Sequence, residues 1–234
     1  LPEHFATGYR VWSSRTHRRA ARGADAVVCV SQTTRRDARA RWGVDDARIV
    51  VALHGPGQGL AVRRTGAEHF LYVGDDEPRK NLGLLLDAYA RYREATGPQA
   101  ALALVLAGRA RSDREGVRNE PRPDLPALLG DAAALVHPAL HEGFGLTALE
   151  AMSAGVPVIA ARSPGLSETC ADAVRYIDPH DGADLAGALR EVGADAALRD
   201  DLARRGAARA AAFSWPASAR AHIAAYTLAR WPGP

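Results

Sequence analysis

The sequence predicts an α/β protein built on a doubly wound parallel sheet with helices on both faces. Its strand candidates are apolar throughout, which is typical of strands buried on both faces. Amphipathic helical patterns separate them, such as the three-four spacing of Leu82, Leu85 and Tyr89. The alternation of these two patterns indicates the parallel class. The candidates are ADAVVCVS (24–31), RIVVAL (48–53), FLYVG (70–74), ALALVLAG (101–108), AALVHP (133–138), VPVIAA (156–161) and VRYID (174–178).

A glycine-rich stretch divides the chain. ALHGPGQGLAVRRTG (52–66) holds four glycines and a proline and has no hydrophobic period, so it is typical of a linker. Two strand candidates precede it, too few for an independent sheet, and five follow it. The predicted organisation is an N-terminal domain remnant (1–55), a linker (56–66), a complete sheet domain (67–213) and a last helix (214–234) that begins at Ser-Trp-Pro.

The apolar runs, the first residues and the cysteines restrict the class of protein that the chain can be. No apolar run approaches the roughly 20 residues of a membrane-spanning helix, and the opening LPEHFATGYR lacks the signal-peptide pattern. The one methionine is Met152, so residue 1 is not a translation start and we expect a piece of a longer protein. Cys29 and Cys170 stand alone in apolar contexts, which favours a reducing cytoplasm over a disulfide framework or a zinc site.

The positive charge is concentrated near the start of the chain. The net charge is +3, but residues 1–48 hold ten arginines against five acids. Such a segment can contact an anionic membrane surface as a peripheral protein. The irregular spacing of the arginines favours the simpler interpretation, a solvated helix face. With 6% aromatic residues and no stacking platform, nucleic acid is not an expected partner.

One loop that follows a strand holds the only lysine. Ligands of parallel sheets bind at the carboxyl ends of the strands, and after the strand that ends at Gly74 comes DDEPRKN. Its Lys80 is the one lysine among 30 basic residues and directly follows Arg79. The acids Asp75 to Glu77 are an alternative metal-binding cluster. The histidines His54, His137, His141 and His180 show no metal spacing, and we interpret them as loop or strand-end residues.

The densest motif is HEGFGLTALEAMSAGVPVIAA (141–161). Gly143 and Gly145 allow a tight turn before a helix that is expected to begin near Leu146, and the unpaired N–H groups of a helix start suit phosphate. Glu142 lies just before that helix and Glu150 lies one turn into it. Carboxylates accept hydrogen bonds from vicinal hydroxyls. Hydroxyls and phosphate in one ligand describe a nucleotide sugar.

The two glutamates in the setting E-G-F-G-L-T-x-L-E-A-M-x-x-G-x-P-V-I-A resemble the signature of retaining glycosyltransferases of family 4. That resemblance implies the GT-B fold, which consists of two facing Rossmann-like domains. It covers nearly the whole chain, through YVGDDEPRKN, LVLAG, DLPALLGDAAALVHPAL, SPGLSE and ADAVVCVSQTTRRDARARWGVDDARIVVALHG. The implied architecture is a donor-binding Rossmann-like domain preceded by part of a second one.

The resemblance also implies residue roles. Glu150 would bind the ribose hydroxyls, and Glu142 would hold the donor sugar together with the backbone that follows it. Arg79 and Lys80 would neutralise the diphosphate, the work that metal does in other transferases. No metal or cofactor is therefore expected. The catalytic residues implied are Glu142, Lys80 and Arg79, and the donor-binding residues are Gly74, Gly143, Phe144, Gly145, Leu146, Thr147 and Glu150.

The sequence departs from the family in three places. Most of the N-terminal acceptor domain is missing. Asp75 stands where many members have a basic residue, which leaves Arg79 as a candidate substitute. Only 16 residues, 109–124, stand where the family usually has a helix and a further strand.

The leading hypothesis is transfer of a hexose, such as mannose or glucose, from a nucleoside-diphosphate sugar to a saccharide, lipid-linked or small-molecule acceptor. One alternative is a nucleotide-sugar-binding module without catalysis of its own. Another is a different GT-B activity, such as a phosphorylase or an epimerase.

Overall fold

The computed structural model describes residues 7–57, 62 and 64–229, with side chains from residue 15 onward. The chain divides into two compact units. One consists of residues 1–56 with 213–234, and the other of residues 57–212. The predicted linker 56–66 straddles this boundary, and its residues 58–61 and 63 lie outside the described residues.

The second unit contains a six-stranded, all-parallel sheet in the order β5-β4-β3-β6-β7-β8. The strand order reverses between β3 and β6, so this pair is the topological switch point of the sheet. The parallel α/β prediction is confirmed. The strands are β3 (His69–Gly74), β4 (Ala103–Gly108), β5 (Val117–Glu120), β6 (Ala132–His137), β7 (Val158–Ala161) and β8 (Arg175–Ile177).

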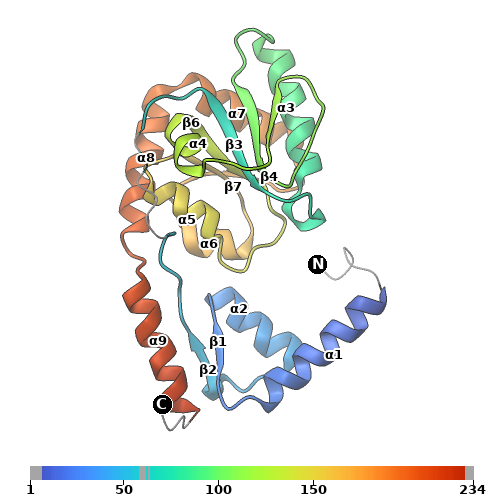
Figure 1. Ribbon diagram of the computed structural model, residues 1–234, viewed down its shortest axis with the longest axis vertical. Helices are drawn as coiled ribbons and strands as arrows, with labels where there is room; N and C mark the ends of the chain where they lie inside the picture. Colours follow the sequence, from blue (N-terminus) through green and yellow to red (C-terminus); the bar gives the residue numbers. More distant parts are fainter. Residues whose placement is uncertain (1–6, 58–61, 63, 230–234) are drawn as a thin grey trace. The chain divides into compact units, whose positions relative to one another are not determined.

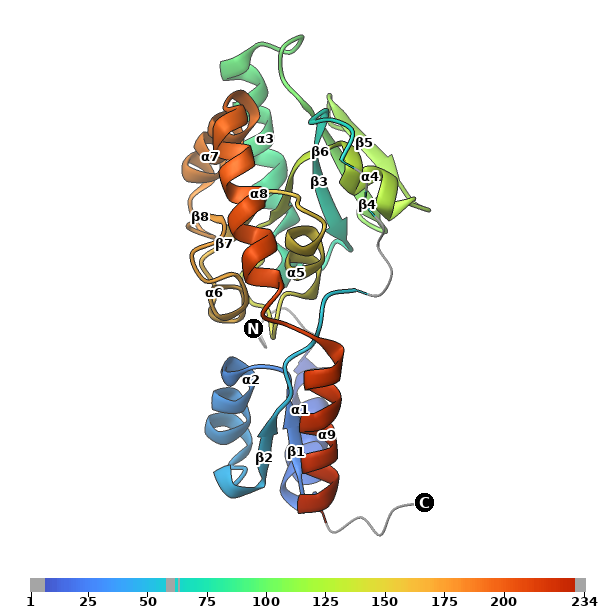
Figure 2. The same cartoon turned by 90° about the vertical axis from the view of Figure 1, so that its left-hand side faces the viewer.

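The central strands are buried on both faces, as their apolar sequences require. Every residue of β6 and of β7 is buried. Helices α3 and α7 pack against each other on one face of the sheet, and α4 covers the other (Figure 2). The helices are α3 (Leu82–Thr96), α4 (Leu125–Asp131), α5 (Leu146–Ser153), α6 (Pro164–Cys170), α7 (Gly182–Ala194) and α8 (Ala196–Ala210). Leu85, Tyr89, Leu185 and Leu189 are among the fully buried side chains of α3 and α7.

The prediction of five strands in this unit is wrong, because β5 lies inside the segment 109–124. Its sequence is Val-Arg-Asn-Glu, and it pairs with β4 at the edge of the sheet. An edge strand is covered on fewer sides than a central one, so polar residues are tolerated there. The segment thus contains a strand, while residues 109–116 and 121–124 form no helix.

The first unit is small. It holds α1 (Thr7–Gly23), β1 (Val27–Cys29), α2 (Gln32–Asp37), a π-helical turn (Ala38–Trp42), β2 (Ile49–Val51) and α9 (Trp215–Leu228), and β1 pairs with β2 in parallel (Figure 1). Helix α2 begins with a capping box between Ser31 and Thr34. The buried core of this first unit is the cluster of Cys29, Ala38 and Val44.

The last helix belongs to the first unit, although it follows the whole second unit in the sequence. Ser214 caps the start of α9, and the helix packs against β1 and β2. Its first residue, Trp215, donates through Nε1 to the carbonyl of Pro56 at 2.6 Å. Among the described residues, no helix combines the length and the apolar character needed to cross a membrane.

Candidate active site

Two loops meet at the carboxyl edge of the sheet, at the switch point between β3 and β6. The loop after β3 contains a short 3-10 helix, Pro78–Lys80, and the loop after β6 leads into α5. Leu140 N–H donates to the carbonyl of Arg79 at 2.9 Å. The amide of Asn81 donates to the carbonyl of Pro138 at 3.2 Å. These bonds hold together the two segments that carry the predicted catalytic residues.

Glu142 is the centre of an ion-pair cluster in these loops. Its Oε1 lies 3.1 Å from Arg79 Nη1 and 3.3 Å from His137 Nε2. Arg79 also donates through Nε to Glu77 Oε2 at 2.8 Å. Side-chain exposure is 17% for Glu142 and 7% for His137, so this carboxylate is largely shielded from water.

The surroundings of Glu142 keep it ionised. Burial by itself raises the pKa of a carboxyl group, but the hydrogen bond and charge of His137, with the charges of Arg79 and Lys80, outweigh burial. The pKa of Glu142 is lowered to about 2. At neutral pH this side chain therefore accepts hydrogen bonds and does not donate a proton.

Lys80 lies over the end of β3. A Cβ placed on Gly74, the last residue of β3, would stand 2.7 Å from Lys80 Nζ and 3.1 Å from its Cδ. The absence of a side chain at position 74 leaves the room that the ammonium group occupies. The predicted residues Gly74, Arg79, Lys80 and Glu142 are thus brought to one edge of the sheet.

Helix α5 begins after a glycine, which has no side chain to cap it. Gly145 is the N-cap in the left-handed region, with φ 91° and ψ 48°, and supplies no side-chain hydrogen bond to the helix start. Phe144 before it is buried, and its carbonyl accepts a hydrogen bond from the hydroxyl of Thr169. The helix begins at Leu146, as predicted, and continues through Thr147.

The loop is also fixed from its other side. A Cβ on Gly165 in α6 would stand 2.0 Å from the carbonyl oxygen of Glu142 and 3.1 Å from the carbonyl carbon of Gly143. Only a residue without a side chain permits this approach, so the backbone of Glu142 and Gly143 packs directly on α6.

Glu150 is not part of the ion-pair cluster. It is half-buried in α5, and desolvation raises its pKa. Its carboxylate faces the backbone at Gly57, where an added Cβ would stand 2.2 Å from Oε1. The prediction that Glu150 lies in the helix after Gly145 is correct, but its close approach to Gly57 in the linker region was not predicted.

Asp75 has a partner from the next strand. Arg109, which follows β4, donates through Nη2 to Asp75 Oδ2 at 2.8 Å, and this hydrogen bond lowers the pKa of Asp75. A basic group therefore does reach this position, supplied by Arg109 from another loop. Asp75 and Glu77 each pair with an arginine, and no group of three metal-ligating side chains occurs in the part of the chain that the structure describes.

His137 is the site residue that sequence reasoning missed. The interpretation as a strand-end residue was correct in position, because His137 is the last residue of β6. Its contact with Glu142, however, was not predicted from that position. The signal present in the sequence was its spacing, five residues before Glu142 and beside Pro138 at the end of an apolar strand.

This doubly wound α/β sheet gathers cations, a shielded carboxylate and an uncapped helix start at its switch point, which is where sheets of this class bind their ligands. The chain belongs to the glycosyl transferases group 1 family, whose model matches residues 61–209. The model of glycosyltransferase family 4 matches residues 2–55.

Named relatives agree with this assignment. O-antigen chain mannosyltransferase B of Escherichia coli is 36% identical over 174 residues, which are 68% of this chain and 45% of the relative. A glycogen synthase of Mycobacterium tuberculosis is 33% identical over 214 residues, covering 83% of this chain and 50% of the relative. The chain thus spans about half the length of these relatives.

Solved structures show the same GT-B fold. Sucrose-phosphate synthase from Thermosynechococcus elongatus has a TM-score of 0.76 at 24% identity, covering 94% of this chain and 62% of that one. Anabaena Alr3699/HepE, solved in complex with UDP and glucose, has a TM-score of 0.78 at 21% identity, covering 98% and 69%.

Proposed function

We propose that the intact protein is a retaining glycosyltransferase that moves a hexose from a nucleoside-diphosphate sugar to an acceptor hydroxyl without a metal ion. The supporting observation is the cluster of Arg79, His137 and Glu142 at the switch point, with Lys80 beside it. Such a site offers fixed positive charge and one ionised carboxylate to the same ligand.

Each group has a part that follows from its charge. When the bond between sugar C1 and the diphosphate oxygen breaks, its electron pair goes to the diphosphate. The acceptor oxygen forms the new bond to C1 on the same face, and its proton passes to the departing diphosphate oxygen. Arg79 and Lys80 stabilise the negative charge that gathers on the leaving group. Glu142, ionised by its surroundings, accepts hydrogen bonds from sugar hydroxyls. His137 fixes the orientation of Glu142.

The nucleotide is proposed to lie along α5. The N–H groups after Gly145 suit the diphosphate, and Glu150 suits the ribose hydroxyls. Anabaena Alr3699/HepE, which shares the fold, holds UDP and glucose, and this supports a nucleotide sugar as the donor class.

Transfer assays with the intact protein test the proposal. Glu142→Ala and Lys80→Ala should abolish transfer while the far-ultraviolet circular dichroism stays unchanged. Arg91→Ala is the matched control. Arg91 is an exposed residue of α3, so its substitution removes a positive charge away from the site. Wild-type rates in either site variant would contradict the assigned roles.

Metal independence has a separate test. Activity should survive in EDTA, since side chains supply the positive charge that a metal ion would otherwise bring. Loss of activity in EDTA that manganese restores would show that Asp75 to Glu77 serve a metal instead.

A second candidate is a nucleotide-sugar-binding module without catalysis of its own. It is favoured by the small size of the sheet in the first unit, which has two described strands where the sheet of the second unit has six. Saturable binding of UDP or GDP by the 234-residue chain without turnover would support it, whereas transfer by the same chain would exclude it.

We propose that the protein is cytoplasmic and that the arginines of its first helix face solvent. Arg15, Arg18 and Arg19 are exposed in α1. The alternative is peripheral contact with an anionic membrane. Cosedimentation with phosphatidylserine-containing vesicles that is lost when these three arginines become serine would favour the alternative.

A further inference from the structure

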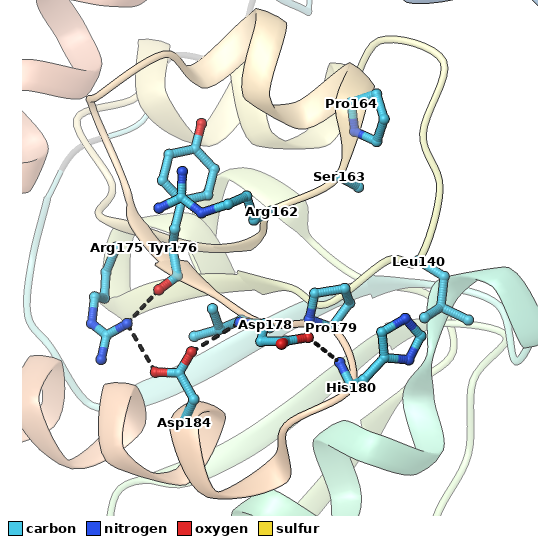
Figure 3. Close-up of a pocket in the computed structure, with 11 residues that line it drawn as sticks. Leu140, Arg162, Ser163, Pro164, Arg175, Tyr176, Asp178, Pro179, His180 and Asp184 are labelled. Carbon is cyan, nitrogen blue, oxygen red and sulfur yellow. Dashed lines mark hydrogen bonds and ion pairs between the residues drawn. The ribbon is translucent and has the colours of Figure 1, made fainter.

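A cavity lies in the larger unit, beside the candidate active site. Its volume is about 670 Å³, within the range of small-molecule sites. It is lined by β8, by the segments that follow β7 and β8, by the start of α7, and by Leu140 from the loop after β6 (Figure 3). Arg79, Lys80, Glu142 and Glu150 do not line it.

Arg162 supplies a cation to this cavity that no carboxylate neutralises among the described residues. Its guanidinium carbon lies 4.4 Å from the centre of the Tyr176 ring, so the cation lies over the aromatic face (Figure 3). The neighbouring Arg175 is different, because it is paired with Asp184 at 3.1 Å and Glu191 at 2.9 Å. The contact with the ring holds the exposed guanidinium in place, and its fork of N–H donors suits a bidentate anion.

Ser163 adds a polar group without a partner on the same wall. It is 2% exposed, and its hydroxyl oxygen is buried with no hydrogen-bond partner. Ser163 is the N-cap of α6, a position where serine normally accepts from the backbone, yet it makes no such bond. A buried hydroxyl without a partner is costly, so a ligand or water atom is expected beside it.

The opposite wall carries a carboxylate suited to hydroxyl groups. Asp178 Oδ1 accepts the backbone N–H of His180 at 2.8 Å, which orients the side chain. Both residues are exposed and line the cavity with the apolar Pro179 and Leu140. The arginine over the Tyr176 ring suits an acidic group of a ligand. The oriented carboxylate suits ring hydroxyls, and the apolar side chains suit the ring itself.

We propose that this cavity is a binding site for an anionic saccharide, a sugar ring bearing a carboxylate or a phosphate that Arg162 holds by its fork. Asp178 and Ser163 contact the ring hydroxyls. This site is separate from the proposed donor site, and binding there does not depend on the proposed transfer reaction.

Isothermal titration calorimetry on the 234-residue chain tests the proposal, with glucuronate, glucose 6-phosphate and glucose as probes. At least one of the two acidic sugars should bind saturably, and glucose roughly tenfold more weakly or worse. Arg162→Gln should weaken the acidic sugar by about tenfold or more. Arg162→Lys, which keeps the charge and loses the fork, should fall between. Arg190→Gln on the exposed face of α7 is the matched charge control and should bind as wild type.

Three outcomes would overturn the proposal. They are no saturable binding of either acidic sugar, equal binding by wild type and Arg162→Gln, and loss of the same binding in Arg79→Ala, which would place the anion at the donor site. UDP or GDP titrated into Arg162→Gln separates the two sites, since nucleotide binding should be unchanged there. Glucuronate and glucose 6-phosphate, compared directly, distinguish a carboxylate from a phosphate.

Discussion

Glutamine in place of Glu142 removes one negative charge from the contacts with Arg79 and His137 while nearly keeping the shape of the side chain. The folded pKa of about 2 lies below the ordinary value of 4.5. A depressed carboxyl pKa contributes stability that is fully present above the unfolded pKa and is lost as pH falls towards the folded one. The stability that Glu142 contributes should therefore disappear between about pH 5 and pH 2.

The size of the effect follows from the shift. The difference in pKa corresponds to about 3 kcal/mol of unfolding free energy at neutral pH. Near pH 3 roughly 1 kcal/mol of it remains, because the carboxyl group of the unfolded chain is then protonated. The stability difference between wild type and Glu142→Gln should thus shrink by about 2 kcal/mol over this range. Effects of the glutamine on packing are independent of pH and cancel.

Urea unfolding at several pH values, followed by far-ultraviolet circular dichroism, measures this difference. The four tryptophans, at positions 12, 42, 215 and 231, all lie outside residues 57–212 in the sequence, the unit that contains Glu142. Tryptophan fluorescence therefore reports on the unit that lacks Glu142 and serves as the internal control. A stability difference that stays constant from neutral pH to about pH 3 would refute the assignment of Glu142 as an ionised, cation-paired group.

Two further changes test the close contacts around the site. Gly57→Ala places a Cβ 2.2 Å from Glu150 Oε1 and should weaken UDP or GDP binding about tenfold by displacing that carboxylate, whereas Gly66→Ala meets nothing closer than 3.4 Å and should not. Unchanged nucleotide affinity in Gly57→Ala would contradict the ribose assignment. Gly165→Ala should cost about 3 kcal/mol in urea unfolding, because its Cβ meets backbone at 2.0 Å. Gly83→Ala, in open space on α3, should instead gain about 0.5–1 kcal/mol, and equal effects of the two would count against the packing argument.

The sheet was predictable because its central strands are apolar along their whole length. β6 and β7 are buried at every residue, so their sequences leave little room for polar side chains. β5 escaped prediction for the opposite reason, since an edge position allowed Val-Arg-Asn-Glu to form a strand by pairing with β4. Local pattern therefore identifies strands with apolar sequences, including the edge strand β8, and misses a polar strand such as β5 that is held by its neighbour.

The site was predictable where one motif carried it. The start of α5 after Gly145 follows from glycine and helix-start chemistry. The partners of the site residues come from elsewhere in the chain. Arg109 reaches Asp75 across 34 positions, and Gly57 approaches Glu150 from the linker region. Such contacts depend on how loops meet in space, and no local spacing specifies them.

The division of the chain has a consequence for its synthesis. The first unit takes α9 from residues that the ribosome delivers after all of residues 57–212. Domains usually fold in the order in which they emerge. Here the later unit has its complete sheet before the earlier one has its last helix. A nascent chain whose residues 1–212 have left the ribosome would carry a finished second unit attached to a first one that still lacks α9, which reverses the usual order along a nascent chain.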